Sequence, residues 1–264
     1  MTKNIVFFDI DGTLLNERTH IIPESTKIAI KKMRENGHLA FINTGRPISE
    51  ISDDIRELGF DGYLCGCGTY IEYNNEVLFY KGLGTDLTKE VAKDLNKYKL
   101  EGFLEGRYGI YYDYIDNIKN DLVLYIMKMH QLAGFYTNAT WHDDNINADK
   151  LIVFVEDSSD FDGFYEKYKD TFDFIERDKN FYEVVPTGYS KATCIEYIIN
   201  KLNIPFENTF AIGDSTNDLS MLEYAHTSIA MGNSNPKLFE IATYITKHVD
   251  EDGIYHALNH FGMI

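Results

Sequence analysis

Residues 4–13 read Asn-Ile-Val-Phe-Phe-Asp-Ile-Asp-Gly-Thr, an apolar run that ends on two acids. The run from Asn4 to Phe8 is β-branched and aromatic, which predicts a fully buried strand. Asp9 stands at the end of this strand, and ligands of open α/β folds sit beyond the carboxyl ends of strands. Because side chains two apart project to the same side of an extended chain, Asp9 and Asp11 face one space. The stretch therefore predicts a carboxylate site at the edge of a sheet.

The flanking sequence alternates between strand and helix patterns. Pro23 and Gly37 bracket an amphipathic helix, which we expect over 24–35. We expect further strands over 38–43, 208–212, 227–231 and 243–246, and further helices over 47–58, 215–224 and 236–241. This alternation is typical of an α/β fold, here a Rossmann-like core whose mostly parallel sheet carries helices on both faces.

The middle of the chain mixes strands and helices in another order. A hairpin is expected over 69–80, around Asn74-Asn75. After it we expect helices over 86–98, 116–130 and 161–168, a half-buried strand over 108–114, and strands over 150–156, 171–176 and 181–185. This order predicts an α+β domain over 82–185, inserted into a core formed by 1–81 and 186–264.

The composition excludes several classes of protein. The 264 residues include 25 basic and 42 acidic side chains, a formal charge of −17. This balance speaks against binding to nucleic acid and to anionic membranes. No stretch approaches the roughly 20 apolar residues that cross a bilayer, and the first apolar run stops too early for an export signal. Three cysteines are too few for a disulfide framework. We expect a cytoplasmic protein, either a monomer or a homodimer.

Three further segments carry residues of the same chemistry. Residues 213–218, Gly-Asp-Ser-Thr-Asn-Asp, follow an apolar strand, with Asp218 one helical turn after Asp214. Thr44-Gly45 joins a strand to a helix start, where amides and a hydroxyl suit a phosphate oxygen. Lys191 lies at the start of another predicted helix. Each of these segments alone is also explained by helix capping or by a solvated charge, and Asp9–Thr13 alone by turn propensity.

Taken together, the segments indicate phosphoryl transfer. Magnesium takes few carboxylates and leaves room for water and phosphate oxygens. The charge of a transferring phosphoryl group is matched by metal, lysine, and hydroxyl or amide donors. An aspartate is ionised at pH 7 without help and can attack phosphorus, which gives an aspartyl-phosphate intermediate.

On these residues the sequence resembles the haloacid dehalogenase-like superfamily, and within it the Cof-type sugar-phosphatase group. The family's order and spacing are matched by Asp9-x-Asp11-Gly12-Thr13-Leu14, Thr44-Gly45-Arg46, Lys191, Gly213-Asp214-x-x-Asn217-Asp218, and the tail Ala230-Met231-Gly232-Asn233-Ser234 with Asp252-Gly253-Ile254. The resemblance covers nearly the whole chain, although the middle domain matches by position and size. Cys67-Gly68 replaces a common Asn-Gly, and Ala192 follows the lysine where glycine is common. Neither departure removes a catalytic group.

The resemblance implies a role for each acid. Asp9 is expected to be the nucleophile and a Mg²⁺ ligand. Asp11 is expected to offer its backbone carbonyl to the metal, to protonate the leaving alcohol, and then to activate the hydrolytic water. Asp214 would complete the metal site, and Asp218 would steady it from behind the ligands or through a water molecule.

The resemblance also implies the phosphate contacts and the reaction. Thr44 and Lys191 are expected to hold the phosphoryl group, with the Gly45 amide and Asn217 as weaker helpers. The expected function is Mg²⁺-dependent hydrolysis of a small phosphorylated metabolite, a sugar phosphate ahead of a phosphorylated cofactor. The middle domain would be the cap that selects this substrate and excludes water. A phosphomutase and a non-catalytic sugar-phosphate sensor remain the alternatives.

Overall fold

A computed structural model describes residues 3–264 of the chain, which divides into two compact units. The first unit holds the chain up to Gly45, Ile51–Phe79 and Ser190–Ile264, and the second holds Arg46–Glu50 and Tyr80–Tyr189. The inserted unit therefore runs a few residues beyond the expected 82–185 at both ends. The short segment 46–50 was expected in the core, yet it belongs to the second unit, where Ser49 Oγ donates to the Gly106 carbonyl at 2.8 Å.

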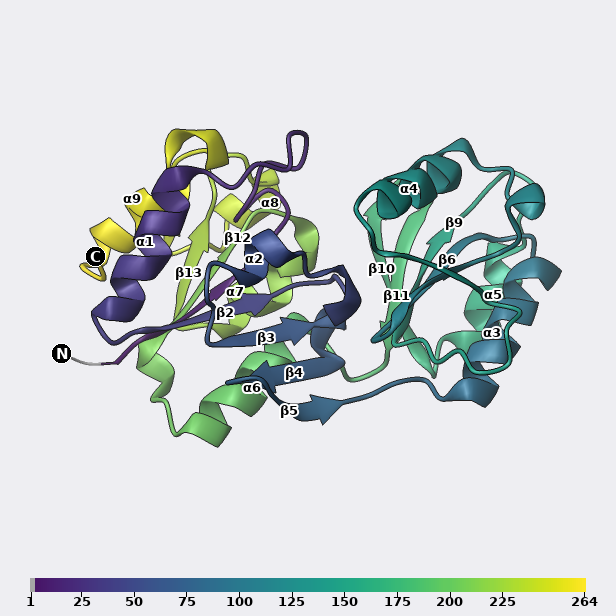
Figure 1. Ribbon diagram of the computed structural model, residues 1–264, viewed down its shortest axis with the longest axis horizontal. Helices are drawn as coiled ribbons and strands as arrows, with labels where there is room; N and C mark the ends of the chain where they lie inside the picture. Colours follow the sequence, from purple (N-terminus) through teal and green to yellow (C-terminus); the bar gives the residue numbers. More distant parts are fainter. Residues whose placement is uncertain (1–2) are drawn as a thin grey trace. The chain divides into compact units, whose positions relative to one another are not determined.

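An eight-stranded sheet forms the centre of the first unit (Figure 1). Its strands in spatial order are β14 (Tyr244–Ile245), β13 (Thr227–Ala230), β12 (Thr209–Gly213), β1 (Ile5–Phe8), β2 (Leu39–Asn43), β3 (Gly62–Cys65), β4 (Tyr70–Tyr73) and β5 (Glu76–Tyr80). The strands from β14 to β3 run parallel, and β4 runs antiparallel to β3. The expected α/β fold with a mostly parallel sheet is confirmed.

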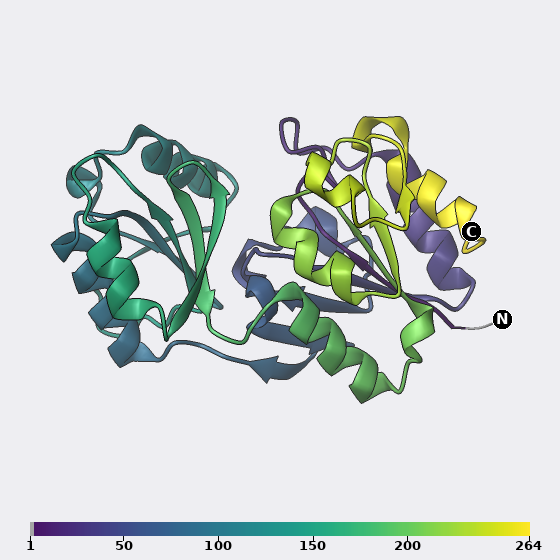
Figure 2. The same cartoon turned by 180° about the vertical axis from the view of Figure 1, so that it is seen from behind.

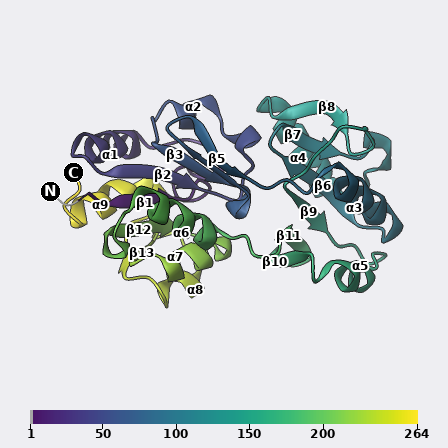
Figure 3. The ribbon, with the colours of Figure 1, turned by 90° about the horizontal axis from the view of Figure 1, so that it is seen from below.

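Helices cover both faces of this sheet (Figures 2 and 3). They are α1 (Glu24–Glu35), α2 (Asp53–Arg56), α6 (Lys191–Leu202), α7 (Leu219–Tyr224), α8 (Pro236–Phe239) and α9 (Gly253–His260). The apolar sides of α6, α7 and α8 share one core cluster with alternate residues of the central strands, such as Phe7 and Phe41. Helices α1 and α9 contact each other on the opposite face. Both faces of β1 are therefore buried, as its apolar run predicts.

The second unit is built around a six-stranded sheet. Its spatial order is β10 (Phe172–Asp178), β11 (Phe181–Pro186), β9 (Lys150–Phe154), β6 (Glu101–Gly106), β7 (Gly109–Tyr112) and β8 (Tyr136–Thr140), flanked by α3 (Thr85–Lys97), α4 (Asp121–Leu132) and α5 (Phe161–Tyr168). Leu151 and Val153 of β9 pack with α3 and α5, whereas Ile152 and Phe154 pack with α4. The unit therefore has three layers, with the mixed sheet in the middle.

Several expected elements are corrected by the structure. The expected helix over 47–58 is wrong as one element, because it splits into a 3₁₀ turn (Ile48–Glu50) and α2, with Ser52 extended between them. The expected helix over 116–130 also divides, into a 3₁₀ turn (Ile115–Asn117) and α4. Asn120 Oδ1 caps α4 by accepting from the amides of Leu122 and Val123. The remaining 3₁₀ turns are Gly66–Gly68, Phe206–Asn208, Thr216–Asp218 and Val249–Glu251.

A buried ionic cluster crosses the sheet of the second unit. Lys150 of β9 contacts the carboxylates of Glu105 on β6 and Glu183 on β11, and Arg177 of β10 pairs with Glu183 at 2.9 Å. Lys150 is 1 % exposed, and burial raises the pKa of Glu105 to about 7 despite the nearby ammonium. Removing one partner from the buried Glu105, Lys150 and Glu183 would leave a buried charge uncompensated, which is destabilising, whereas Arg177 is half-buried.

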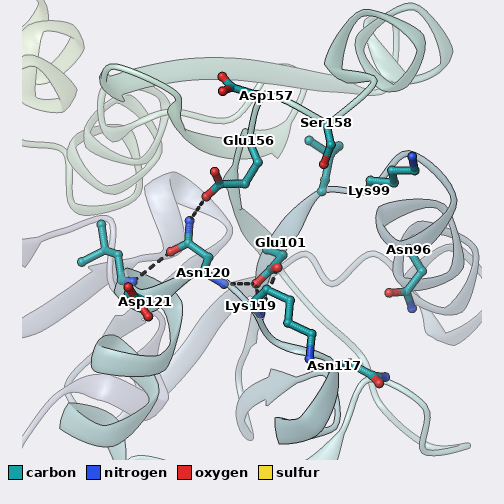
Figure 4. A pocket seen from close by; sticks show the side chains of 12 residues that line it. Asn96, Lys99, Glu101, Asn117, Lys119, Asn120, Asp121, Glu156, Asp157 and Ser158 are labelled. Atoms are coloured by element: carbon teal, nitrogen blue, oxygen red, sulfur yellow. Dashed lines mark hydrogen bonds between the residues drawn. The ribbon is translucent and has the colours of Figure 1, made fainter.

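A polar pocket of about 750 Å³ lies at the other end of β6 (Figure 4). Glu101 points into it, and its carboxylate accepts hydrogen bonds from the amides of Lys119 and Asn120. Asn120 in turn donates to Glu156. Glu101, the first residue of β6, therefore holds the chain segment just before α4 in place.

Two further expectations concern cysteines and membranes. Cys65, Cys67 and Cys194 are buried thiols without a disulfide. Within residues 3–264, no helix combines the length and the apolar character needed to cross a bilayer.

The segment that enters the second unit is fixed through a buried acid, Asp149. Its Oδ1 accepts from the Tyr80 hydroxyl at 2.7 Å, and the side chain of Asn147 binds the same hydroxyl and the Gly84 amide. Burial raises the pKa of Asp149 to about 7, and the charge of Glu105 adds to the increase. The carboxyl group is thus harder to ionise in the folded chain than in the unfolded chain.

We expect Asp149→Asn to raise the melting temperature at pH 8 and to leave it nearly unchanged at pH 4. A folded pKa of about 7 against about 3.9 unfolded means that the folded state holds this proton more tightly. The stability that depends on Asp149 is therefore lost as pH rises from about 4 to about 7. Asparagine keeps the acceptor for Tyr80 and carries no charge. Melting curves across this pH range check the expectation, and a variant that loses more stability at pH 8 than at pH 4 contradicts it.

Candidate active site

The predicted site residues of the first unit follow three neighbouring strands. Asp9 follows β1, Thr44 follows β2 and Asp214 follows β12. Because β1 runs parallel to both β2 and β12, the carboxyl ends of the three strands lie at one edge of the sheet. The fold therefore brings together residues that are about 200 positions apart in the sequence.

Three carboxylates meet at this edge. Each of Asp9, Asp214 and Asp218 is buried and offers an oxygen, and these oxygens lie within 4.8 Å of one another. Asp218 is held by the turn after β12, where its Oδ2 accepts from the amides of Asp214 and Ser215 at 2.9 and 3.0 Å. Asp218 thus fixes the backbone of Asp214, the acid at the start of the same turn.

Lys191 is the counter-charge of this cluster. The residue begins α6 after the N-cap Ser190, and only 1 % of it is exposed. Its Nζ donates to Asp9 Oδ1 at 2.6 Å and to Asp218 Oδ1 at 2.5 Å. Asn43, the last residue of β2, donates from Nδ2 to the Lys191 carbonyl at 2.9 Å. A position that looks like a surface charge in the sequence is therefore fully buried.

The charges of the cluster do not balance. Burial, together with the charge of Asp218, raises the pKa of Asp9 to about 7, and burial with the charge of Asp9 raises that of Asp214 to about 9. Burial alone lowers the pKa of Lys191, but the charges of Asp218 and Asp9 outweigh it and raise this pKa. Lys191 thus pairs with two of the three acids, Asp9 and Asp218. The surplus negative charge and the hard oxygen donors fit a divalent cation such as Mg²⁺.

The loop after Asp9 lies against Asp214. Thr13 Oγ1 donates to Asp214 Oδ1 at 2.8 Å. Gly12 adopts a φ of +80°, and a Cβ on it would stand 2.2 Å from Asp214 Oδ2. Glycine is therefore required here both for the backbone conformation and for the approach of the carboxylate.

The other predicted residues lie around this cluster. Asp11 is half-buried and stands outside the group of three carboxylates, although its charge contributes to the raised pKa of Asp9. Thr44 and Gly45 are buried, and the Thr44 carbonyl accepts from the Cys67 amide at 3.2 Å. Asn217 is half-buried, and its Oδ1 accepts from Ser215 Oγ at 2.6 Å.

The contacts of Thr13, Asn43 and Asn233 at the site were not predicted from the sequence. Asn233 Nδ2 donates to the Gly12 carbonyl at 2.7 Å. Asn43 ends β2, and Thr13 and Asn233 lie in the loops that follow β1 and β13, at the same edge of the sheet as the acids. Polar residues at that edge of a parallel sheet are therefore the signal that could have found them.

We expect Gly12→Ala to destabilise the protein and to weaken its stabilisation by Mg²⁺, because the new methyl group displaces Asp214. Gly134→Ala is the matched control, since Gly134 lies just after α4 with a φ of +78° and has open space where its Cβ would stand. Both variants carry the strain of a left-handed alanine, about 1–2 kcal/mol. The change in melting temperature on adding Mg²⁺ separates the effect of the methyl contact with Asp214 from the effect of backbone strain. Equal Mg²⁺-dependent shifts in the two variants contradict the expected role of Gly12.

The chain is similar to known proteins over nearly its whole length. The family model for haloacid dehalogenase-like hydrolases matches residues 6–258. YkrA of Bacillus subtilis (strain 168), whose name classes it with the phosphatases, is 30% identical over 268 residues, 100% of both chains. YitU of the same organism, a 5-amino-6-(5-phospho-D-ribitylamino)uracil phosphatase by name, is 25% identical over 97% of each chain. The solved HAD subclass IIB sugar phosphatase BT4131 is 28% identical, with a TM-score of 0.82 over 99% of this chain and 100% of its own. The chain belongs to the haloacid dehalogenase-like hydrolases.

Proposed function

We propose that this phosphatase hydrolyses a small phosphomonoester with the help of Mg²⁺, through a phosphorylated Asp9. The observation that carries the proposal is the buried Asp9 at the end of β1, in contact with Lys191 and beside Asp214. A sugar phosphate leads as substrate, and a phosphorylated cofactor comes next. The names of two relatives, a sugar phosphatase and a phosphoribitylaminouracil phosphatase, support this substrate class.

The first half of the reaction breaks the ester. An oxygen of Asp9 attacks phosphorus, and the bond from phosphorus to the alcohol oxygen breaks. Asp11 gives its proton to the departing oxygen. Lys191 and Thr44, with the Gly45 amide and Asn217, hold the phosphoryl oxygens while negative charge moves onto them. The products of this step are the free alcohol and the acyl phosphate on Asp9.

The second half restores the enzyme. Asp11, now ionised, takes a proton from water, and the resulting oxygen attacks the phosphorus of phospho-Asp9. Inorganic phosphate leaves and the carboxylate of Asp9 is regenerated. When bound, Mg²⁺ supplies positive charge to the phosphoryl oxygens. The carboxylates of Asp9 and Asp214 and the Asp11 carbonyl would hold it, and Asp218 would keep Asp214 in place through its amide.

The second unit is proposed as the cap that selects the leaving alcohol. This assignment extends the sequence-based expectation for 82–185 to the observed Tyr80–Tyr189. The cytoplasmic location and the monomeric or homodimeric state expected from the sequence stay predictions. Hydrolysis rates over a panel of sugar phosphates, flavin mononucleotide and pyridoxal phosphate would rank the candidate substrates.

We expect Asp9→Asn to lower the Mg²⁺-dependent release of p-nitrophenol from p-nitrophenyl phosphate by about a thousandfold or more. The amide still accepts from Lys191, so folding is retained while the nucleophile is lost. Asp157→Asn, which makes the same change at an exposed residue of the second unit, is the control and should match the wild type.

Three outcomes would contradict this assignment. An inert wild-type protein that still binds sugar phosphates would identify a sensor. Conversion of one sugar phosphate into its isomer without phosphate release, dependent on a bisphosphate activator, would identify a mutase. Retention of activity in Asp9→Asn would exclude Asp9 as the nucleophile.

A further inference from the structure

The loop that follows β13 touches both acid-bearing loops of the site. From this loop, the Met231 amide and Ser234 Oγ bind the Gly213 carbonyl at 3.0 and 3.3 Å, next to Asp214. Asn233 reaches the other loop, where its Nδ2 donates to the Gly12 carbonyl at 2.7 Å. The motif 230–234 thus joins two segments that are more than 200 residues apart in the sequence.

The orientation of the Asn233 amide is fixed by its two neighbours. The Gly12 carbonyl can only accept, so the atom that faces it must be the nitrogen. The Val249 amide can only donate, and it donates to Asn233 Oδ1 at 2.9 Å. The side chain is half-buried and uses both of its ends. No other arrangement of this amide satisfies both partners.

Gly12 is the residue of the loop that most needs such a contact. It stands in a left-handed conformation between Asp11 and Thr13, and glycine resists backbone rotation less than any other residue. Its amide is held by the Leu15 carbonyl at 2.9 Å, within the loop. Its carbonyl is held by Asn233, from outside the loop. Loss of the second bond leaves the peptide between Gly12 and Thr13 to the longer bond from the Thr13 amide to the Ile10 carbonyl, at 3.3 Å. The hydroxyl of the same Thr13 binds Asp214.

We propose that Asn233 is a positioning residue, whose hydrogen bond to the Gly12 carbonyl keeps the loop from Asp11 to Thr13 in register with Asp214. This inference rests on the proposed function, because the register matters for the metal site and for the acid Asp11. Lys191 and Asp218 hold Asp9 and Asp214 independently of Asn233. Removal of the contact should therefore loosen Mg²⁺ binding and slow catalysis while the metal-free fold persists.

The test replaces Asn233 by aspartate. Asn233→Asp keeps the acceptor for Val249 and loses only the donor to Gly12. We expect the Mg²⁺ dissociation constant, measured by the shift in melting temperature without substrate, to rise about tenfold. We also expect kcat for p-nitrophenyl phosphate to fall about tenfold, with KM changed less than twofold, and the metal-free melting temperature to stay near the wild type. An added negative charge alone would tighten cation binding, so the expected weakening is opposite to a general charge effect.

Asn235→Asp is the matched control. It makes the same change in the same loop, and its side chain, which caps α8 by accepting from the Lys237 amide, still does so as aspartate. It should behave as the wild type. Asn233→Leu, which is neutral and loses both bonds, serves as the second variant if aspartate prevents folding, and it should weaken Mg²⁺ binding at least as much.

Three results would overturn the proposal. The first is wild-type Mg²⁺ binding and kcat in Asn233→Asp, and the second is an equal loss of Mg²⁺ binding and kcat in Asn235→Asp. The third is a loss in Asn233→Leu that Asn233→Asp does not share, because that result would assign the effect to the contact with Val249. An inert wild-type enzyme would overturn the proposed function instead. The Mg²⁺-dependent melting shift would then still decide the role of Asn233, because it needs no substrate.

Discussion

The site depends on one electrostatic constraint, the burial of three carboxylates around a single lysine. Buried charges are tolerated only when partners compensate for the lost water. Here Lys191 and the backbone amides after β12 supply that compensation, and they do so from elements that only the folded sheet brings together. The parallel pairing of β1 with β12 is therefore a condition for the chemistry, because it places Asp9 beside Asp214.

The same constraint divides the acids by role. Both oxygens of Asp218 are engaged, one by Lys191 and the other by two backbone amides, so this acid acts as a fixed anchor. Asp9 and Asp214 have fewer donors, and burial raises the pKa of each. A raised carboxyl pKa means that the ionised form lacks compensation. Asp9 and Asp214 are the two acids whose carboxylates the family resemblance assigns to the metal.

The sequence predicted the helices and strands that follow from the residue pattern of the segment itself. Residues 4–8 and 209–213 are apolar strands that end on acids, and α5 matches its expected range. It did not predict β6, because Glu101, Gly102 and Gly106 make that segment unlike a strand. The close approach of β9 requires Gly102, and Lys150 from the same strand compensates for Glu105. The need for Gly102 and the compensation of Glu105 both depend on residues that are distant in the sequence. The burial of Lys191 depends on distant residues too.

Under the proposed function, the charge surplus would also couple binding of the cation to binding of the substrate. A phosphate monoester brings further negative charge into a cluster where Lys191 already pairs with Asp9 and Asp218. Lys191 alone therefore cannot offset the substrate. In the proposed mechanism Asp9 must be ionised to attack phosphorus, yet its raised pKa indicates that the metal-free site opposes ionisation. Additional positive charge between Asp9 and Asp214 would stabilise the two ionised carboxylates. The same charge would lower the repulsion between these carboxylates and the phosphoryl group. Cation and substrate should thus bind with positive coupling, and linkage makes that coupling reciprocal.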